Sequence, residues 1–314
     1  MLKRTLLMAL ATAVGQGTVG FHATVDTVAV YATVRQHDGQ LARGLEKADF
    51  EIFDNGKRRE ITTFSNDVEP ISLAILIDRS SSLEKQFASI NTAAEAAVKT
   101  LLPDDRVSIS SLSWDCLALT LDKPAALSML RSPRQGDIGS PLWAGLDRIL
   151  ASFEGEAGRR AVLLFSDGND NFQLQTSYLR TASGVQSGPF TWQGPCHVPT
   201  AGSPYATLQQ VQQRISRDGP VVFVVSVEGS SGRSNDAQLS SIAHDSGGAF
   251  YALKDDGVKS ALAGLSRMLH NQYLLGFVPA VFDDKVHEIE VRVRRPGVVV
   301  QARKSFVATR SSLR

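Results

Sequence analysis

The stretch LAILIDRSSSL (residues 73–83) decides the fold. Its first part, residues 73–77, is a continuous apolar run, which is typical of a strand buried on both faces of a parallel sheet. Asp78 ends the run, and Ser80 and Ser82 follow at alternate positions. In open parallel sheets, ligands bind beyond the carboxyl ends of the strands, where the strand order reverses. The stretch therefore predicts a core strand together with a candidate binding loop.

Strands and helices continue to alternate after this stretch. The predicted elements are a helix over 84–102, a strand over 107–112, helices over 125–130 and 142–153, a strand over 161–165, a helix over 208–215, a strand over 221–227, a helix over 237–244, a strand over 250–253 and a helix over 258–269. This alternation predicts an α/β fold, a doubly wound, mostly parallel sheet between two layers of helices. Residues 168–204 show no clear periodicity, and a loop of this length inside a compact domain is usually functional or disordered.

Both flanks of the α/β region have strand character. Apolar residues alternate over 24–34, and Asn55-Gly56 between two apolar runs predicts a tight hairpin. Near the other end, apolar residues alternate over 289–293, and Pro296-Gly297 predicts a turn into a partner strand over 298–302. Either fragment alone is too small to be stable. We therefore expect one small antiparallel β domain, built from both ends of the chain, with the α/β domain inserted in it.

The beginning of the chain resembles a secretory signal peptide. Lys3 and Arg4 precede an apolar run over 6–11 and then small residues. The other interpretation is a frayed amphipathic helix. The expected organisation is a signal peptide over 1–20, the small β domain over 21–68 and 274–314, and the α/β domain over 69–273. Export would place the protein in the periplasm or outside the cell, where Cys116 and Cys196 are permitted to pair.

The composition excludes several classes of protein. The 314 residues are 43% hydrophobic and 21% charged, with a formal net charge of +1. Nothing in this balance favours nucleic acid or an anionic membrane. No run of roughly 20 apolar residues exists, so no integral membrane segment is expected after signal cleavage. Two cysteines are too few for a disulfide scaffold or a typical structural zinc site.

The candidate metal ligands come from three separate turns. The candidates are two carboxylates and three hydroxyls, from Asp78, Ser80, Ser82, Ser140 and Asp167. This set holds only hard oxygen ligands, which suit Mg²⁺, with Mn²⁺ or Ca²⁺ as alternatives, and disfavour zinc and copper. The sequence thus predicts a divalent cation as the cofactor.

These residues resemble the metal-ion-dependent adhesion site of von Willebrand factor A domains. The segment ILIDRSSSL (75–83) is similar to the D-x-S-x-S signature of that family, and Ser166-Asp167-Gly168 is similar to its aspartate turn. The turn beginning at Gly139-Ser140-Pro141 resembles the loop that carries a threonine in the family, with Ser140 in the place of the threonine. Arg79 is a second departure, because it places a cation inside the metal loop. The resemblance covers roughly residues 71–273.

The flanking segments DFEIFDNGKRREITTF, HDSGGAFY, NQYLLGF and HEIEVRV are similar to an exported bacterial subfamily of von Willebrand factor A-related proteins. The resemblance implies metal-dependent protein–protein interaction or adhesion. The partner would be a protein that supplies an Asp or Glu to the metal, and the chain would not be an enzyme.

Two other functions remain open at this stage. One is a metal-independent scaffold of the cell envelope, and the other is an uncharacterised hydrolase. No G-x-S-x-G elbow, Walker A loop or H-E-x-x-H segment occurs. His244 precedes Gly247-Gly248 in a pattern that is typical of a helix end. The run Asp167-Gly168-Asn169-Asp170-Asn171 lacks the glycine and the glutamate of a complete calcium loop.

Overall fold

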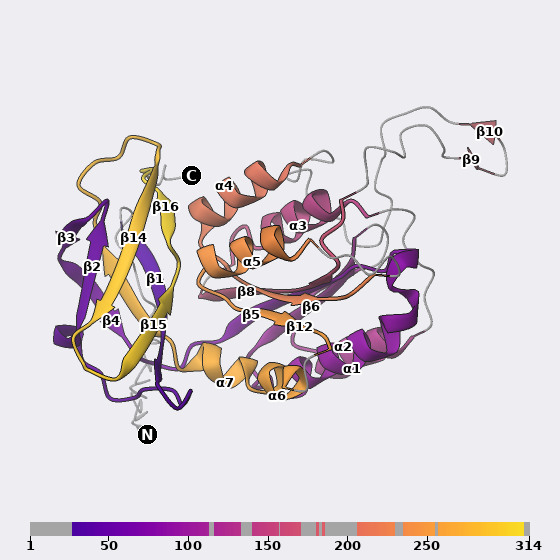
Figure 1. The fold of residues 1–314 in the computed structure, drawn as a ribbon, viewed down its shortest axis with the longest axis horizontal. Coiled ribbons are helices and arrows are strands. Elements are labelled where there is room, and N and C mark those ends of the chain that lie inside the picture. Colours follow the sequence, from indigo (N-terminus) through magenta and orange to yellow (C-terminus); the bar gives the residue numbers. More distant parts are fainter. Residues whose placement is uncertain are drawn as a thin grey trace, which may run out of the picture.

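The computed structural model describes residues 27–112, 116–132, 140–156, 158–170, 180–181, 184–185, 206–229, 235–254 and 257–310. Figure 1 shows a layered unit, in which helices cover both faces of a sheet, beside a smaller unit built of strands. Within the described residues, no helix combines the length and the apolar character that a membrane span requires.

The main sheet of the layered unit has six strands in the order β12-β11-β8-β5-β6-β7. Their bounds are β5 Ile71–Ile77, β6 Arg106–Ser111, β7 Cys116–Thr120, β8 Arg159–Ser166, β11 Val221–Ser226 and β12 Phe250–Ala252. All neighbouring pairs are parallel except β6 and β7. The chain begins in the middle of the sheet at β5, extends to one edge, and returns through β8 to the other edge. The strand order therefore reverses between β5 and β8.

Helices bury apolar side chains against both faces of this sheet. One face carries α1 Phe87–Val98, α2 Lys123–Arg131, α6 Val258–Ala263 and α7 Leu265–His270, and the other carries α3 Leu142–Ala151, α4 Leu208–Asp218 and α5 Asp236–Asp245. All seven residues of β5 are buried, as a continuous apolar run in a two-sided sheet requires. Trp143 packs in the core between α3 and the sheet.

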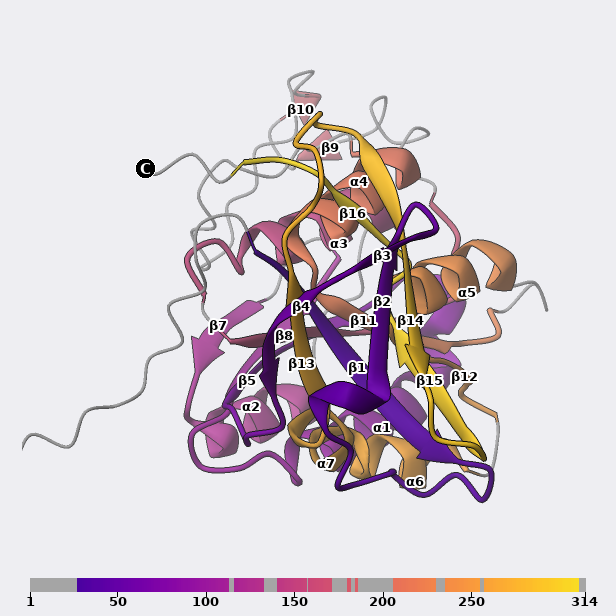
Figure 2. The same ribbon diagram turned by 90° about the vertical axis from the view of Figure 1, so that its left-hand side faces the viewer.

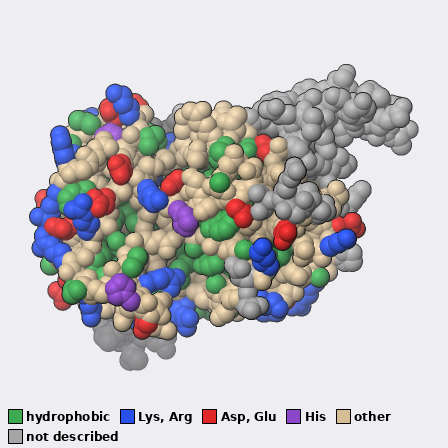
Figure 3. All heavy atoms as spheres, in the orientation of Figure 1, with side chains coloured by type: hydrophobic (Ala, Val, Ile, Leu, Met, Phe, Trp, Pro, Cys, Tyr) green, Lys and Arg blue, Asp and Glu red, His purple; other side chains and the backbone are tan. Residues whose placement is uncertain are grey.

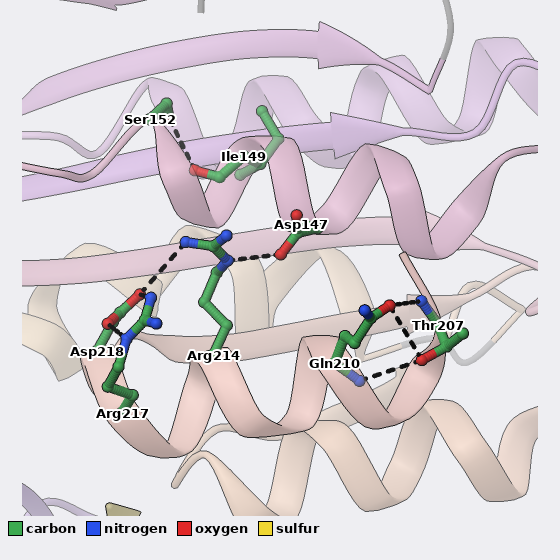
Figure 4. A network of polar contacts seen from close by, with 8 residues as sticks. All are labelled: Asp147, Ile149, Ser152, Thr207, Gln210, Arg214, Arg217 and Asp218. Carbon is green, nitrogen blue, oxygen red and sulfur yellow. Dashed lines mark hydrogen bonds and ion pairs between the residues drawn. The ribbon is translucent and has the colours of Figure 1, made fainter. Parts of the chain in front are cut away.

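Polar contacts fix α4 beside α3 (Figure 4). Thr207 caps the first turn of α4 and forms a reciprocal capping box with Gln210. Arg214 of α4 donates from Nε to Asp147 Oδ1 of α3 at 2.5 Å. Helix α4 ends at Gly219, whose φ of 74° is the left-handed conformation that glycine favours at this position.

The smaller unit consists of two four-stranded antiparallel sheets, in the orders β15-β1-β13-β4 and β16-β14-β2-β3. Its strands are β1 Val28–Gln36, β2 Phe50–Asp54, β3 Lys57–Arg59, β4 Ile61–Ser65, β13 Tyr273–Phe277, β14 Val286–Val293, β15 Val298–Ala302 and β16 Ser305–Val307. The two sheets share one apolar core, so we call this unit the sandwich. Figure 2 shows strands from both ends of the chain interleaved in it.

A buried arginine joins the two units where the chain crosses between them. Arg159 begins β8, and its Nη2 donates to the carbonyl of Asp67 at 3.2 Å and to the carbonyl of Gln272 at 3.0 Å. Asp67 precedes β5, and Gln272 precedes β13, so one guanidinium holds both connections. This contact fixes where the layered unit leaves the sandwich.

The structure confirms the main features of the predicted fold, namely the six-stranded, mostly parallel sheet and antiparallel sheets made from both ends of the chain. The hairpin is also confirmed, because Asn55 and Gly56 have φ values of 48° and 73° between β2 and β3. The exact domain limits stay predictions. Residues 1–26, most of 168–204 and Cys196 lie outside the described part of the chain, so the signal peptide and the cysteine pairing stay predictions too.

Other details differ from the sequence-based expectations. The helix expected over 84–102 begins as a 3-10 helix over Ser81–Gln86, and α1 ends at Val98. The helix expected over 258–269 is interrupted at Gly264, which weakens helix propagation. The strand β15 was expected to pair with 289–293, but it pairs with β1 in the other sheet. The strands β7 and β16 were not anticipated.

Candidate metal centre

The candidate metal centre lies at the point where the strand order of the main sheet reverses. The parallel strands β5 and β8 pair with Ile77 opposite Phe165, so both end at the same edge. The backbone N–H of Asp78 donates to the Phe165 carbonyl at 2.8 Å. Asp78 and Asp167 therefore leave adjacent strands side by side, at the place where α/β sheets bind ligands.

The loop after β5 curls so that its alternate side chains converge. Asp78 Oδ1 accepts the backbone N–H of Ser80 at 3.0 Å. The carbonyl of Ser80 then accepts the N–H of Leu83 at 3.0 Å, as the 3-10 helix begins. In this conformation the hydroxyls of Ser80 and Ser82 lie 3.0 Å apart. The sequence places these three residues at alternate positions, and the structure shows that their side chains converge.

The loop after β8 joins this group through hydroxyl hydrogen bonds. The Ser82 hydroxyl donates to Asp167 Oδ2 at 3.0 Å, and the Ser166 hydroxyl donates to Asp78 Oδ2 at 2.9 Å. The Ser166 hydroxyl also accepts the N–H of Gly168 at 3.0 Å. Together these bonds link both carboxylates into one network with three serines.

Gly168 lets the Asp167 turn pack closely against α5. Its φ is +77°, and a Cβ at this position would lie 2.7 Å from the Cβ of Asn235. Both the backbone conformation and the available space therefore favour glycine. The Asp167 carbonyl also accepts the Asn235 N–H at 2.7 Å, which anchors the turn to the start of the helix.

Ser140 is buried in the turn before α3. This turn is linked to the loop after β8, because the N–H of Leu142 donates to Asp170 Oδ1 at 3.2 Å. The structure thus brings Asp78, Ser80, Ser82 and Asp167 into one network, and connects the turn that carries Ser140 to it through Asp170.

The electrostatics of the network are unbalanced. Burial is the main cause that raises the pKa of Asp78 to about 6; the nearby Asp167 carboxylate contributes to this rise, and hydrogen bonds from Ser80 and Ser166 oppose it. Within the described ranges, neither Asp78 nor Asp167 forms an ion pair with a Lys, Arg or His. Two buried carboxylates without a cationic partner are an arrangement that a bound cation stabilises.

Arg79 packs against a neighbouring aromatic ring. Its guanidinium carbon lies 5.2 Å from the ring centroid of Phe87, at the start of α1. This is the distance of a cation–π contact. The cation that the sequence placed inside the metal loop therefore has an aromatic partner there.

The residues present fit a hard divalent cation. Among the residues that the structure describes, no group of three or more His, Cys, Asp or Glu side chains could hold a metal ion. A metal at this edge would therefore depend on serine hydroxyls in addition to Asp78 and Asp167. Carboxylate and hydroxyl oxygens are ligands for Mg²⁺, Mn²⁺ or Ca²⁺.

Sequence reasoning missed the role of Ser166. Its hydroxyl is fully buried and bridges Asp78 to the Asp167 turn. A serine two residues before a turn glycine is typical of a side chain that caps its own turn, and this signal could have identified it. The contact with Asp78 depends on the pairing of two strands that are distant in sequence.

Two serine–histidine pairs bear on the hydrolase hypothesis. Ser266 Oγ lies 3.2 Å from His270 Nδ1, and His270 Nε2 lies 2.9 Å from Asp105 Oδ1, but all three side chains are buried. Asp105 also accepts the backbone N–H groups of Ile71 and Leu102, so its carboxylate has a structural role in the interior. The second pair, Ser240 and His244, lies on the exposed side of α5. The first group contacts Ile71 at the start of β5, whereas Asp78 follows the end of that strand.

No protein-family model and no curated protein matches the sequence. Several solved structures are similar in fold. A von Willebrand factor type A protein from Catenulispora acidiphila has 10% identity and a TM-score of 0.46, over 91% of this chain and 75% of that chain. The pilus adhesin SpaC from Lactobacillus rhamnosus GG has 11% identity and a TM-score of 0.45, over 88% and 42%. The vWF domain of the pilus tip protein Mfa5 from Porphyromonas gingivalis has 14% identity and a TM-score of 0.43, over 64% and 95%.

This chain spans only 42% of the length of SpaC and 49% to 50% of the mussel byssus protein PTMP1, which is also similar in fold. At these identities and TM-scores the likeness describes a similar arrangement of elements, and no conclusion about binding follows from it.

Proposed function

We propose that this chain is a metal-dependent binding module, which recognises an acidic side chain of a protein partner. A divalent cation, most simply Mg²⁺, would be held at the edge of the main sheet by Asp78 and Asp167. The observation that supports this proposal is the network of buried carboxylates, joined by serine hydroxyls, in which neither carboxylate has a cationic partner among the described residues.

Asp78 and Asp167 would supply the negative charge of the site, and the serines around them would orient the carboxylates and add neutral oxygen ligands. Asp78 is held on one oxygen by the Ser80 N–H and on the other by the Ser166 hydroxyl, so its position is fixed before any ion binds. The hydroxyls of Ser80 and Ser82 face each other and add neutral oxygens. Ser140 would coordinate the cation directly when the partner is bound.

The bound cation would supply Lewis acidity toward an additional oxygen ligand. Two carboxylates balance the charge of a divalent ion, and the serine hydroxyls add no further negative charge. An Asp or Glu from a partner can therefore still be attracted. This charge balance favours recognition of an acidic group over recognition of a neutral one.

We further propose that the protein acts outside the cytoplasm, in adhesion or in the assembly of surface structures. The basic and then apolar start of the chain supports export. The partner, on this proposal, is a protein, and neither nucleic acid nor a membrane is required.

Titration calorimetry with Mg²⁺ on the EDTA-treated, dialysed protein tests the metal site. We expect saturable binding by the wild type and by Glu84→Gln, since Glu84 is an exposed carboxylate on the 3-10 helix beside the site. We expect no binding by Asp78→Ala. Equal binding by the wild type and Asp78→Ala would show that the assigned site is wrong.

The metal-independent scaffold makes a different prediction for partner capture. If capture of a surface protein by the wild type persists unchanged in EDTA and in Asp78→Ala, the scaffold is the correct function. On our proposal, both treatments abolish capture, while Glu84→Gln retains it.

A further inference from the structure

A second candidate site lies in a cleft between the sandwich and the layered unit. The cleft has a volume of about 710 Å³. Its walls come from β1 and the loop that follows it, from β15, from the edge strand β12, and from α6 and α7. It is separate from the metal centre, because none of its lining residues belongs to the loops that carry Asp78, Ser140 or Asp167.

The charged residues that line the cleft, among those that the structure describes, all have the same sign. They are Arg35, Arg43 and Arg267, and no described lining residue is an Asp or Glu. None of the three arginines forms an ion pair with any residue that the structure describes. Asp255 and Asp256 precede Gly257 in the sequence and lie outside the described residues. In Figure 3, Lys and Arg side chains gather on the lower part of the face where the sandwich meets α6 and α7.

Arginines on the outer side of the sandwich behave differently. Arg58 and Arg294 both contact Glu51, and Arg292 contacts Glu290. Unpaired arginines in one cleft repel each other, and this repulsion is relieved when an anion binds among them. The arginines on the outer side of the sandwich have acidic partners, whereas the arginines of the cleft have none among the described residues.

Arg35 has no anionic acceptor among the described residues that line the cleft. It is half-buried, and its guanidinium donates to the Gly39 carbonyl at 3.1 Å and to the thioether sulfur of Met268 at 2.8 Å. A thioether is a weak acceptor, so much of the hydrogen-bonding capacity of this guanidinium is unused. Guanidinium groups match carboxylate and phosphate oxygens in pairs.

We propose that this cleft binds a small anion that carries two or more carboxylate or phosphate groups. Its volume lies within the usual range for small-molecule sites, roughly 300–1,000 Å³. Arg35 forms the inner contact, and the exposed Arg43 and Arg267 close on the anion from the sandwich and from α7. The half-buried Tyr251 adds an aromatic ring and a phenolic hydroxyl to the wall. Because the arginines belong to both units, the bound anion also stabilises the junction between them.

The test uses inorganic pyrophosphate and citrate as probes, in titration calorimetry at low salt, on protein that has been stripped of metal and dialysed into chelator-free buffer. We compare the wild type with Arg43→Gln/Arg267→Gln, which changes two exposed side chains, and with the matched control Arg292→Gln/Arg295→Gln on the sandwich. We expect saturable binding by the wild type and the control, and at least about a tenfold loss of affinity in the cleft variant. Circular dichroism checks that each variant is folded.

The two probes distinguish the sources of the anion. Binding of pyrophosphate alone identifies a phosphate ligand, binding of citrate alone identifies a carboxylate ligand, and binding of both supports a site for either group. Asp78→Ala should bind the probes as the wild type does, so failure of the metal site would not affect this result. The proposal is overturned if neither probe binds saturably, or if the cleft variant binds as tightly as the wild type.

Discussion

Two buried carboxylates, one in each unit of the molecule, are held in opposite ways. Asp54 of the sandwich is 1% exposed, and its oxygens lie 2.7 Å from His287 Nδ1 and 3.1 Å from Arg59 Nε. Asp78 of the layered unit is 0% exposed, and its hydrogen bonds come from a backbone N–H and from serine hydroxyls. The first carboxylate thus has a cationic partner, and the second has none among the residues that the structure describes.

This difference separates a structural group from a candidate site. A buried charge with complete partners contributes to a unique packing, whereas a buried charge without a cation costs stability. Burial raises the pKa of Asp78 to about 6, which is the sign of that cost. Proteins tolerate such costs mainly at functional sites, where a ligand supplies the missing partner.

The largest change in the free energy of unfolding is expected when Asp54, whose partners include a histidine and an arginine, is replaced. Asp54→Ala leaves His287 and the partly buried Arg59 without their shared acceptor. We expect the free energy of unfolding to fall by about 3–5 kcal/mol, as for other broken buried pairs. Urea denaturation followed by far-UV circular dichroism measures the change. Glu51→Ala, which removes only surface contacts, should lose far less, and equal losses would remove the contrast between the two carboxylates.

Removal of the Asp78 charge should stabilise the metal-free protein, which is the opposite of the effect expected at Asp54. Asp78→Asn removes the buried charge, so at pH 8 in EDTA we expect the free energy of unfolding to rise by up to about 3 kcal/mol. The sign follows from the pKa of Asp78, which rises from 3.8 to about 6 on folding. The folded wild type binds this proton more tightly than the unfolded chain, so its stability falls as the pH rises from about 4 to about 6.

Urea denaturation at pH 4 and pH 8 checks this pH dependence. At pH 4 Asp78 is protonated in the folded protein, and the variant should differ little from the wild type. Glu84→Gln serves as the control, because Glu84 is exposed beside the same loop. A variant that matches the wild type at pH 4 but is less stable than the wild type at pH 8 would show that the Asp78 charge stabilises the metal-free fold.

The central strands of the main sheet could be predicted because both of their faces are buried. Every residue of β11 and all but one of β8 are buried, and these strands appear in the sequence as continuous apolar runs. The edge strand β7 was missed although its sequence, CLALT, is also largely apolar. Its described side chains are half-buried or exposed, it pairs on one side only, and its pairing with β6 contains a register shift. The turn at Pro296-Gly297 was identified, but a turn does not specify which sheet receives the next strand. For β15 the partner is β1, which is about as distant in sequence as the fold allows.

The candidate site was predictable to the extent that its residues follow strands directly. Asp78 and Asp167 were placed together because parallel strands end at one edge. The Ser166 contact and the arginine cleft were not predictable, because they depend on which strands and helices become neighbours. The contact between Arg35 and Met268, for example, joins positions 233 residues apart.

The pH dependence of Mg²⁺ binding separates the two carboxylates further. Below pH 6 an ion must displace the proton on Asp78, so we expect the affinity to fall about tenfold for each pH unit. Above pH 7 the affinity should be nearly constant. Calorimetry between pH 5 and pH 8 measures this profile, and Asp54→Asn should keep it. An affinity that does not change across this range would show that Asp78 gives up no proton to the ion.

The smallest effect concerns the hydroxyl that Ser166 directs at Asp78. This hydrogen bond stabilises the ionised carboxylate, so Ser166→Ala should raise the pKa of Asp78 further and move the pH midpoint of Mg²⁺ binding upward by about 1 unit. Ser108→Ala is a matched control, because Ser108 is buried on β6, the neighbouring strand of the same sheet, and its hydroxyl has no partner among the described residues. The same calorimetric titrations provide both midpoints. If the two serine variants share one profile, the Ser166 hydroxyl only caps the turn through Gly168, and the pKa of Asp78 is set by burial, by Asp167 and by the hydrogen bonds from Ser80.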